Sequence, residues 1–314
     1  MILVLGALGQ LGLELTQNLR QSLGAQAVLA ADIRTPSDHF LAEGPFERVD
    51  CCDAAALEAL FRQYPIDQLY YLPALLSSKA EKFPKQTVET NFIGLFHSLE
   101  LVRKYPCRVF YPSTIGVFSA DSPTLDTPQN CMMRPKTIYG TTKLAGELLC
   151  EYYHHKYSMD IRSIRLPGVI SHQVCPQGGT TDYAVEMFYA AQNTKVYTSY
   201  LEADTILDMV YIDDAIRGIL QLMQTDRCCL HSGVVYNLTA MQFSVAELHA
   251  ALREYYPDFE LCFEVDPLRQ QIANSWPERI NDLWAREEWG WNPQYQFKDM
   301  VRTMLFHLQK QTHV

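Results

Sequence analysis

Several features are missing from this 314-residue sequence, and each absence excludes a class of protein. No run of about 18 uninterrupted apolar residues occurs, which excludes an ordinary membrane-spanning helix. The nine cysteines include no Cys-x-x-Cys pair, and no histidines cluster with them, so we expect no metal centre. A net charge of −10 argues against nucleic acid or an anionic membrane as a partner. The remaining expectation is a small-molecule partner.

The chain also lacks an internal repeat, a low-complexity tract and a Gly/Ser-rich linker, so nothing divides it into independent units. It opens directly on the apolar run Ile2–Leu5 without a targeting segment, and we expect a cytoplasmic protein with reduced thiols. A hydrophobic content of 48% suffices for one large core with a smaller lobe.

Short apolar runs alternate with helical patterns through the first half of the chain. The predicted strands are Met1–Leu5, Val28–Ala31, Gln68–Leu72, Arg108–Tyr111 and Ile161–Arg165. Apolar residues at three- and four-residue spacing predict helices at Leu11–Leu23, Ala54–Tyr64, Gln86–Lys104 and Tyr139–Lys156. Because parallel strands need long crossovers, this alternation predicts an α/β fold with a doubly wound parallel sheet.

Three glycines follow the first predicted strand in the spacing Gly6-x-x-Gly9-x-x-Gly12. Glycines permit a tight turn and let the backbone approach a pyrophosphate, and the helix that follows offers free amides. Such a turn can also be purely structural. Asp32, placed after the second strand, favours the dinucleotide because its carboxylate can accept hydrogen bonds from ribose hydroxyls. That carboxylate repels a 2′-phosphate and so favours NAD over NADP, a preference that nearby Arg34 weakens.

Tyr139 and Lys143 stand four residues apart, on one face of a predicted helix. A phenol has a pKa near ~10 and is a poor base unless a cation stabilises its phenolate. With Lys143 as that cation, Tyr139 can take the proton of a substrate hydroxyl while hydride leaves the same carbon. Ser113 and Thr114 end a predicted strand, and we expect the Thr114 hydroxyl, with Ser113, to orient the reacting oxygen. The Tyr/Lys spacing alone also fits an exposed helix pair.

Beyond Arg165 the pattern loosens and prolines become frequent. We place an NAD-binding region with the Tyr/Lys helix at residues 1–165 and a smaller substrate lobe at residues 166–314. The lobe is expected to interleave with the main sheet, and Val210–Ile212 and Val234–Asn237 are candidates for late strands of that sheet.

Together these motifs resemble the extended short-chain dehydrogenase/reductase superfamily, most closely its epimerase/dehydratase branch. The segments Asn91–Gly94 and Arg165–Gly168 add to a match that covers nearly the whole chain. The resemblance implies a Rossmann-like domain with NAD, a Ser/Thr–Tyr–Lys catalytic group and a homodimer formed through helices that include the Tyr139 helix. It also places Asp50 and Cys51 near the adenine and Leu72–Ala74 near the ribose-diphosphate. Within that second segment, Pro73 departs from the more usual small residue. The implied cofactor contacts are Gly6, Leu8, Gly9, Gln10, Leu11, Gly12, Asp32, Arg34, Asp50, Cys51, Leu72, Ala74, Asn91, Tyr139, Lys143 and Leu166.

Longer strings are similar to the short-chain L-threonine dehydrogenases. They are Ala74–Ser77, Gly178–Met187, Met209–Asp214, Ser275–Pro277 and Trp289–Trp291. This resemblance implies oxidation of the C3 hydroxyl of L-threonine to 2-amino-3-oxobutanoate, with hydride transfer to NAD. The implied substrate contacts are Ser77, Gly179, Thr180, Thr181 and Trp276. Without the resemblance, the residues at 178–181 also fit an ordinary loop and helix cap. Trp276 also fits a role in core packing.

Two alternatives remain open at this point. A nucleotide-sugar 4-epimerase or dehydratase would share the fold and the NAD, but it needs a basic, roomy lobe, and this lobe is acidic. A non-catalytic NAD-sensing protein would be free to lose Tyr139 or Lys143, and both are present.

Overall fold

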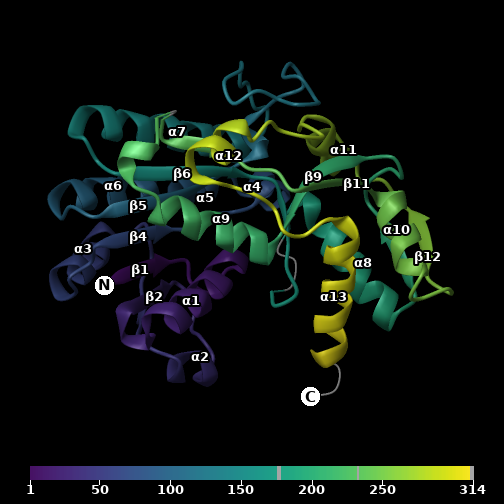
Figure 1. Ribbon diagram of the computed structural model, residues 1–314, viewed down its shortest axis with the longest axis horizontal. Helices are drawn as coiled ribbons and strands as arrows, with labels where there is room; N and C mark the ends of the chain where they lie inside the picture. Colours follow the sequence, from purple (N-terminus) through teal and green to yellow (C-terminus); the bar gives the residue numbers. More distant parts are fainter. Residues whose placement is uncertain (175–177, 232, 312–314) are drawn as a thin grey trace.

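The computed structural model describes residues 1–174, 178–231 and 233–311, and a parallel sheet lies at its centre (Figure 1). The strands of this sheet are β1 (Ile2–Leu5), β2 (Val28–Asp32), β3 (Phe46–Arg48), β4 (Gln68–Tyr71), β5 (Arg108–Thr114), β6 (Ile161–Leu166) and β10 (Val235–Asn237). Their order is β10-β6-β5-β4-β1-β2-β3, and every neighbouring pair is parallel. The order reverses between β1 and β4, where open α/β sheets bind ligands.

Helices bury both faces of the sheet. On one face lie α1 (Gln10–Leu23) and α9 (Ile212–Gln224), and on the other lie α3 (Ala54–Gln63), α6 (Gly94–Lys104) and α7 (Ile138–Tyr157). Side chains alternate across a strand, so Val4 enters the first core while Leu3 and Leu5 enter the second. Burial on both faces accounts for the continuous apolar runs of these strands. The predicted doubly wound parallel sheet is confirmed.

The helix predicted over Gln86–Lys104 is interrupted. The chain forms α5 (Pro84–Val88), a π-helical turn at Glu89–Ile93 and then α6 without leaving the helical path. A wider turn of this kind adds one residue to the hydrophobic spacing, which is too small a change for periodicity to reveal.

One of the two candidate late strands was placed wrongly. Val235–Asn237 joins the main sheet beside β6, as expected. Val210 instead belongs to β9 (Ile206–Tyr211), in a separate three-stranded sheet with β7 (Gly168–Ile170) and β11 (Met241–Ser244). Pro167 separates β6 from β7 and has no amide to continue the ladder, so the chain leaves the main sheet there and β9 pairs with β7.

The rest of the carboxyl-terminal half forms a smaller lobe against the three-stranded sheet. Its further elements are α8 (Tyr183–Asn193), β8 (Val196–Ser199), α10 (Val245–Arg253), β12 (Glu260–Phe263), α11 (Pro267–Asn274), α12 (Leu283–Trp289) and α13 (Phe297–Gln311). Two short helices, α2 (Asp38–Ala42) and α4 (Ser77–Lys82), complete the first half. The division at residue 165 stays a prediction. β10 and α9 come from the second half of the sequence and complete the main sheet and one of its helical layers. No helix within the described ranges is long and apolar enough to cross a membrane.

Candidate active site

A groove runs past the carboxyl ends of β1, β4 and β5, at the point where the strand order reverses. It consists of one cavity of about 580 Å³ and two of about 130 Å³ each. Leu72, Ala74 and Leu76 line all three, so the cavities form one continuous path. The largest cavity lies toward β2, and the opposite end of the path reaches the α7 residue Tyr139.

The glycine turn forms the middle of this path. Gly6 has a φ of +82°, which side chains other than hydrogen rarely allow, and a Cβ there would lie 3.0 Å from the Pro73 nitrogen. A Cβ on Gly12 would lie 2.1 Å from the carbonyl oxygen of Gly6, so only glycine lets α1 approach the turn. No side chain caps α1, and its first amides face the groove as an anion site. This cradle fits a pyrophosphate.

Asp32 lies at the end of β2 and is 5% exposed. Its carboxylate accepts hydrogen bonds from the Leu8 amide at 3.0 Å and from the Arg34 amide at 2.9 Å. The Arg34 guanidinium adds two more at 3.0 and 3.1 Å. Burial raises the pKa of Asp32, but these hydrogen bonds outweigh burial and hold it below its usual value. Both residues line the largest cavity, with the carboxylate ionised.

Other predicted cofactor residues divide into those that line the groove and those that support it. Asp50 and Cys51 line the largest cavity. Asn91 is buried and does not line any of the three cavities. Its amide group instead exchanges hydrogen bonds of 2.8 and 3.1 Å with the backbone of Leu75. Asn91 thus fixes the segment that walls the path, and Leu8 similarly acts through its amide on Asp32.

Three predicted catalytic residues meet at the far end of the groove. Thr114, Tyr139 and Lys143 line the same cavity and are 7%, 8% and 3% exposed. Burial raises the pKa of Tyr139, and a hydrogen bond with the Thr114 side chain opposes that rise. Burial lowers the pKa of Lys143 to about 7. The Lys143 ammonium donates to the carbonyl oxygen of Pro112 at 2.8 Å.

Ser113, the fourth predicted catalytic residue, has its hydroxyl engaged elsewhere. Although it borders the cavity, it donates to the buried carboxylate of Glu147. The Arg165 guanidinium donates two hydrogen bonds, of 2.8 and 2.9 Å, to the same Glu147 carboxylate. Consecutive residues of a strand point to opposite faces, so Ser113 supports α7 while Thr114 points toward Tyr139. The sequence did not single out Glu147, although it follows Lys143 by one helical turn.

The predicted substrate residues come from three segments that converge on this cavity. Ser77, Gly179, Thr181 and Trp276 line it. Thr180 is fully buried behind the cavity wall, where its amide donates to the Ser77 oxygen at 3.0 Å and the two hydroxyls lie 3.1 Å apart. Ser77 therefore both faces the cavity and ties the 178–182 segment to α4.

A model of the NAD-dependent epimerase/dehydratase family matches residues 2–238. The chain belongs to this family.

The relatives of this member of the NAD-dependent epimerase/dehydratase family extend over its whole length. An uncharacterised epimerase/dehydratase from Staphylococcus haemolyticus is 46% identical over 97% of this chain and 96% of its own. A solved L-threonine dehydrogenase from Clostridium difficile is 40% identical, with a TM-score of 0.95 over 99% of this chain and 98% of that one. A solved protein described as a monomeric L-threonine 3-dehydrogenase from a metagenome is 40% identical, with a TM-score of 0.96 over 99% of each chain.

Two further groove contacts in this family member escaped sequence reasoning. The Asp182 carboxylate accepts from the amides of Gly178 and Gly179, each at 2.8 Å, and closes the loop on itself. The Gln10 side-chain amide donates to the Val169 carbonyl oxygen at 3.0 Å and joins α1 to β7. Both bonds depend on where loops turn, which side-chain type alone does not specify.

Proposed function

We propose that this protein is an NAD-dependent L-threonine 3-dehydrogenase that oxidises the C3 hydroxyl of L-threonine to 2-amino-3-oxobutanoate. One observation carries the proposal: Thr114, Tyr139 and Lys143 share a small cavity with Ser77 and Thr181. The relatedness to solved L-threonine dehydrogenases at 40% identity over 99% of this chain supports the choice of substrate.

The residues of the groove fit NAD. The uncapped first turn of α1 and the close approach that Gly6 and Gly12 allow suit the pyrophosphate. Asp32 suits ribose hydroxyls, and the cavity beside Asp50 and Cys51 suits the adenine. When bound, NAD accepts the hydride that leaves C3 of the substrate.

The protein residues manage the proton. The Tyr139 phenolate takes the hydroxyl proton as the carbonyl forms, so the carbon loses a hydride and the oxygen loses a proton. Lys143, one helical turn away in a buried site, stabilises the phenolate electrostatically. The Thr114 hydroxyl, bonded to Tyr139 here, holds the reacting oxygen beside the phenol.

The substrate end of the groove suits a small amino acid. Its cavity of about 130 Å³ is smaller than the roughly 300–1,000 Å³ typical of sites for larger ligands. The Ser77 and Thr181 hydroxyls and the Gly179 backbone offer polar contacts to the carboxylate and ammonium, and Trp276 covers the apolar side. A nucleotide sugar would need more room, which argues against the 4-epimerase alternative. The buried, complete Thr–Tyr–Lys group argues against a non-catalytic sensor.

The test is turnover. The purified protein is incubated with NAD and L-threonine, and the absorbance of the reduced cofactor is followed. We expect reduction with L-threonine, slow reduction with L-serine, which lacks the methyl group, and none with L-2-aminobutyrate or a nucleotide sugar. Tyr139→Phe should abolish turnover and leave NAD binding nearly unchanged, because the phenol acts mainly in the transition state. Reduction with a nucleotide sugar but not with L-threonine would refute the proposal.

A further inference from the structure

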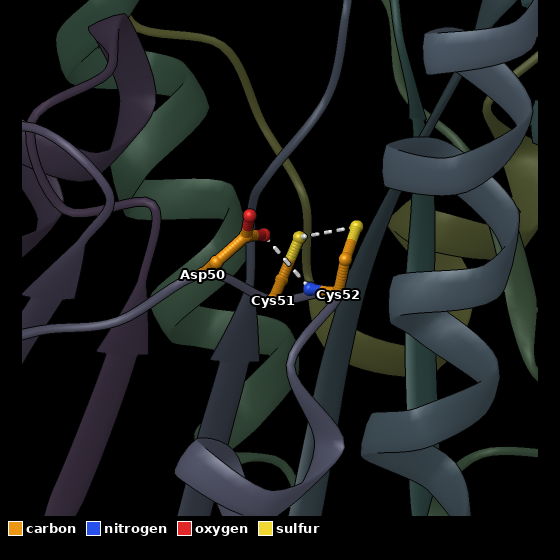
Figure 2. Close-up of side chains that lie close together, drawn as sticks. All are labelled: Asp50, Cys51 and Cys52. Carbon is orange, nitrogen blue, oxygen red and sulfur yellow. Dashed lines mark hydrogen bonds between the residues drawn. The ribbon is translucent and has the colours of Figure 1, made fainter.

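Two thiols and a carboxylate gather at the cofactor groove, between β3 and α3. Asp50, Cys51 and Cys52 are consecutive, and their side chains rise on the same side of the backbone (Figure 2). The two sulfur atoms lie 4.0 Å apart, and all three potential ligand atoms lie within 4.8 Å of one another. All three residues line the cavity of about 580 Å³. None of the proposed catalytic steps uses the thiols.

The distances between these groups match those of a tetrahedral coordination site for a thiophilic cation. Zinc–thiolate bonds of about 2.3 Å at a tetrahedral angle place two sulfurs roughly 3.8 Å apart. The observed separation of 4.0 Å needs little adjustment. A carboxylate makes the third ligand, and three protein ligands leave the fourth position open to water from the cavity.

The backbone holds the three groups in place without a metal. The Cys52 amide donates to the Asp50 carboxylate at 2.9 Å, and the Asp53 amide donates to the Asp50 carbonyl oxygen at 3.0 Å, which closes a tight turn. Behind Cys51, a Cβ on Gly94 would lie only 2.9 Å from the sulfur, so α6 prevents that sulfur from retreating. The Cys52 thiol donates to the Glu89 carbonyl oxygen at 3.4 Å and is partly exposed.

We propose that Asp50, Cys51 and Cys52 form an inhibitory binding site for a thiophilic divalent cation, Zn²⁺ or Cd²⁺, which competes with the cofactor. On binding, the two thiols release two protons, and the cation is held by two thiolates and one carboxylate. Metal binding stands on this geometry alone. Competition follows because the bound cation and its water occupy the groove wall beside the proposed adenine position, and it rests on the proposed function.

The chain offers a matched control for adjacent thiols. Cys228 and Cys229 are also consecutive, and both are exposed and lie outside the groove. If adjacency alone sufficed to bind the cation, this second pair would bind it too. Comparing the two pairs in one protein therefore separates the effect of the groove from the effect of two adjacent thiols.

The experiment titrates the full-length protein with Cd²⁺ under a thiol-free reductant and follows the thiolate-to-cadmium charge-transfer absorbance. We expect one tight equivalent in wild type and in the double variant Cys228→Ser/Cys229→Ser, and its loss in both Cys52→Ser and Cys52→Ala. Thermal melts confirm that each variant is folded. Unchanged Cd²⁺ binding in the Cys52 variants, or its loss in the double variant, would overturn the site.

The second measurement uses Zn²⁺ and kinetics, with each variant normalised to its own metal-free rate. The apparent KM for NAD should rise about elevenfold when free Zn²⁺ is ten times its dissociation constant, because two ligands compete for one site. The KM for L-threonine should stay constant. Metal binding with an unchanged KM for NAD would overturn the competition. Because the absorbance titration needs no turnover, failure of the proposed dehydrogenase activity leaves the metal site independently testable.

Discussion

At the scale of single residues, we expect the Asp32–Arg34 pair to set the choice between NAD and NADP. The Asp32 carboxylate already accepts four hydrogen bonds, three of them from Arg34. The Arg34 side chain is 46% exposed, and exposed ion pairs contribute little to stability. A ribose hydroxyl can therefore displace the guanidinium at small cost. Without the carboxylate, the same guanidinium would be free to bind a 2′-phosphate.

Asp32→Ala should weaken NAD binding by about 10- to 100-fold, since a charge-assisted hydrogen bond contributes about 1.5–3 kcal/mol. It should also strengthen NADP binding, because Arg34 loses its partner. Dissociation constants for both cofactors, measured by calorimetry, check this expectation. Arg34→Ala is the matched control and should leave NAD binding within a few-fold. Wild-type protein that binds NADP as tightly as NAD would contradict the assignment.

Part of the candidate site could be predicted from the spacing of residues in the sequence. The placement of the glycines, Asp32 and the Tyr139/Lys143 pair along one groove follows from their spacing, because each proposed role requires a residue type at a fixed offset. The different orientations of Ser113 and Thr114 do not follow, since both have hydroxyls and only the pleat of β5 separates them. Asn91 likewise supports the groove wall, because only the fold places Leu75 against it.

At the scale of elements, residues 178–182, just before α8, are bound to α4 across the groove. The Asp182 side chain binds the amides of this loop, and Ser77 of α4 binds Thr180 across the groove. Burial raises the pKa of Asp182. The loop is therefore held from inside by Asp182 and from across the cavity by Ser77.

Ser77→Ala should raise the KM for L-threonine by about 2- to 10-fold, since one hydrogen bond contributes roughly 0.5–1.5 kcal/mol. The KM for NAD should change less, because the glycine turn and Asp32 lie elsewhere along the groove. Steady-state kinetics with each substrate varied in turn provide the measurement. Ser22→Ala removes a comparable hydroxyl bond on the exposed end of α1 and should change neither constant. Equal increases in both constants would argue against the substrate role of Ser77.

Regular elements were predictable and their connections were not. The spacing of hydrophobic residues predicts the ends of α1, α3, α7 and the first strands to within a few residues. The placement of β9 depended instead on Pro167, which ends one ladder, and on β7, a three-residue strand that has little pattern of its own. Short strands carry too few residues to show a period.

At the scale of the whole molecule, the outer faces of α6 and α7 expose large apolar side chains. Phe96 is 39% exposed, Leu148 57% and Tyr152 48%. These helices cover one face of the sheet, and the exposed side chains face away from it. We propose that this surface forms the homodimer interface. The same helix, α7, carries Tyr139 and Lys143 near its amino-terminal end. One solved relative is described as monomeric.

Leu148→Glu should convert the dimer to a monomer, because a charge placed at the centre of an apolar interface is desolvated without a partner. Sedimentation velocity measures the change in mass. Leu23→Glu is the control, since Leu23 is 56% exposed but lies on α1, on the opposite face of the sheet. Equal masses for wild type and the Leu148 variant would remove this surface as the interface.

The position of β10 has a consequence for folding of the nascent chain during synthesis. β10 lies at the edge of the main sheet beside β6, and Asn237 at its end meets the buried Arg165 guanidinium. As a ribosome releases the chain from its amino end, six strands can assemble while the outer edge of β6 still lacks its neighbour. An open strand edge invites aggregation and chaperone capture. Biosynthesis thus passes through a vulnerable interval that ends only when the polypeptide beyond Asn237 has emerged.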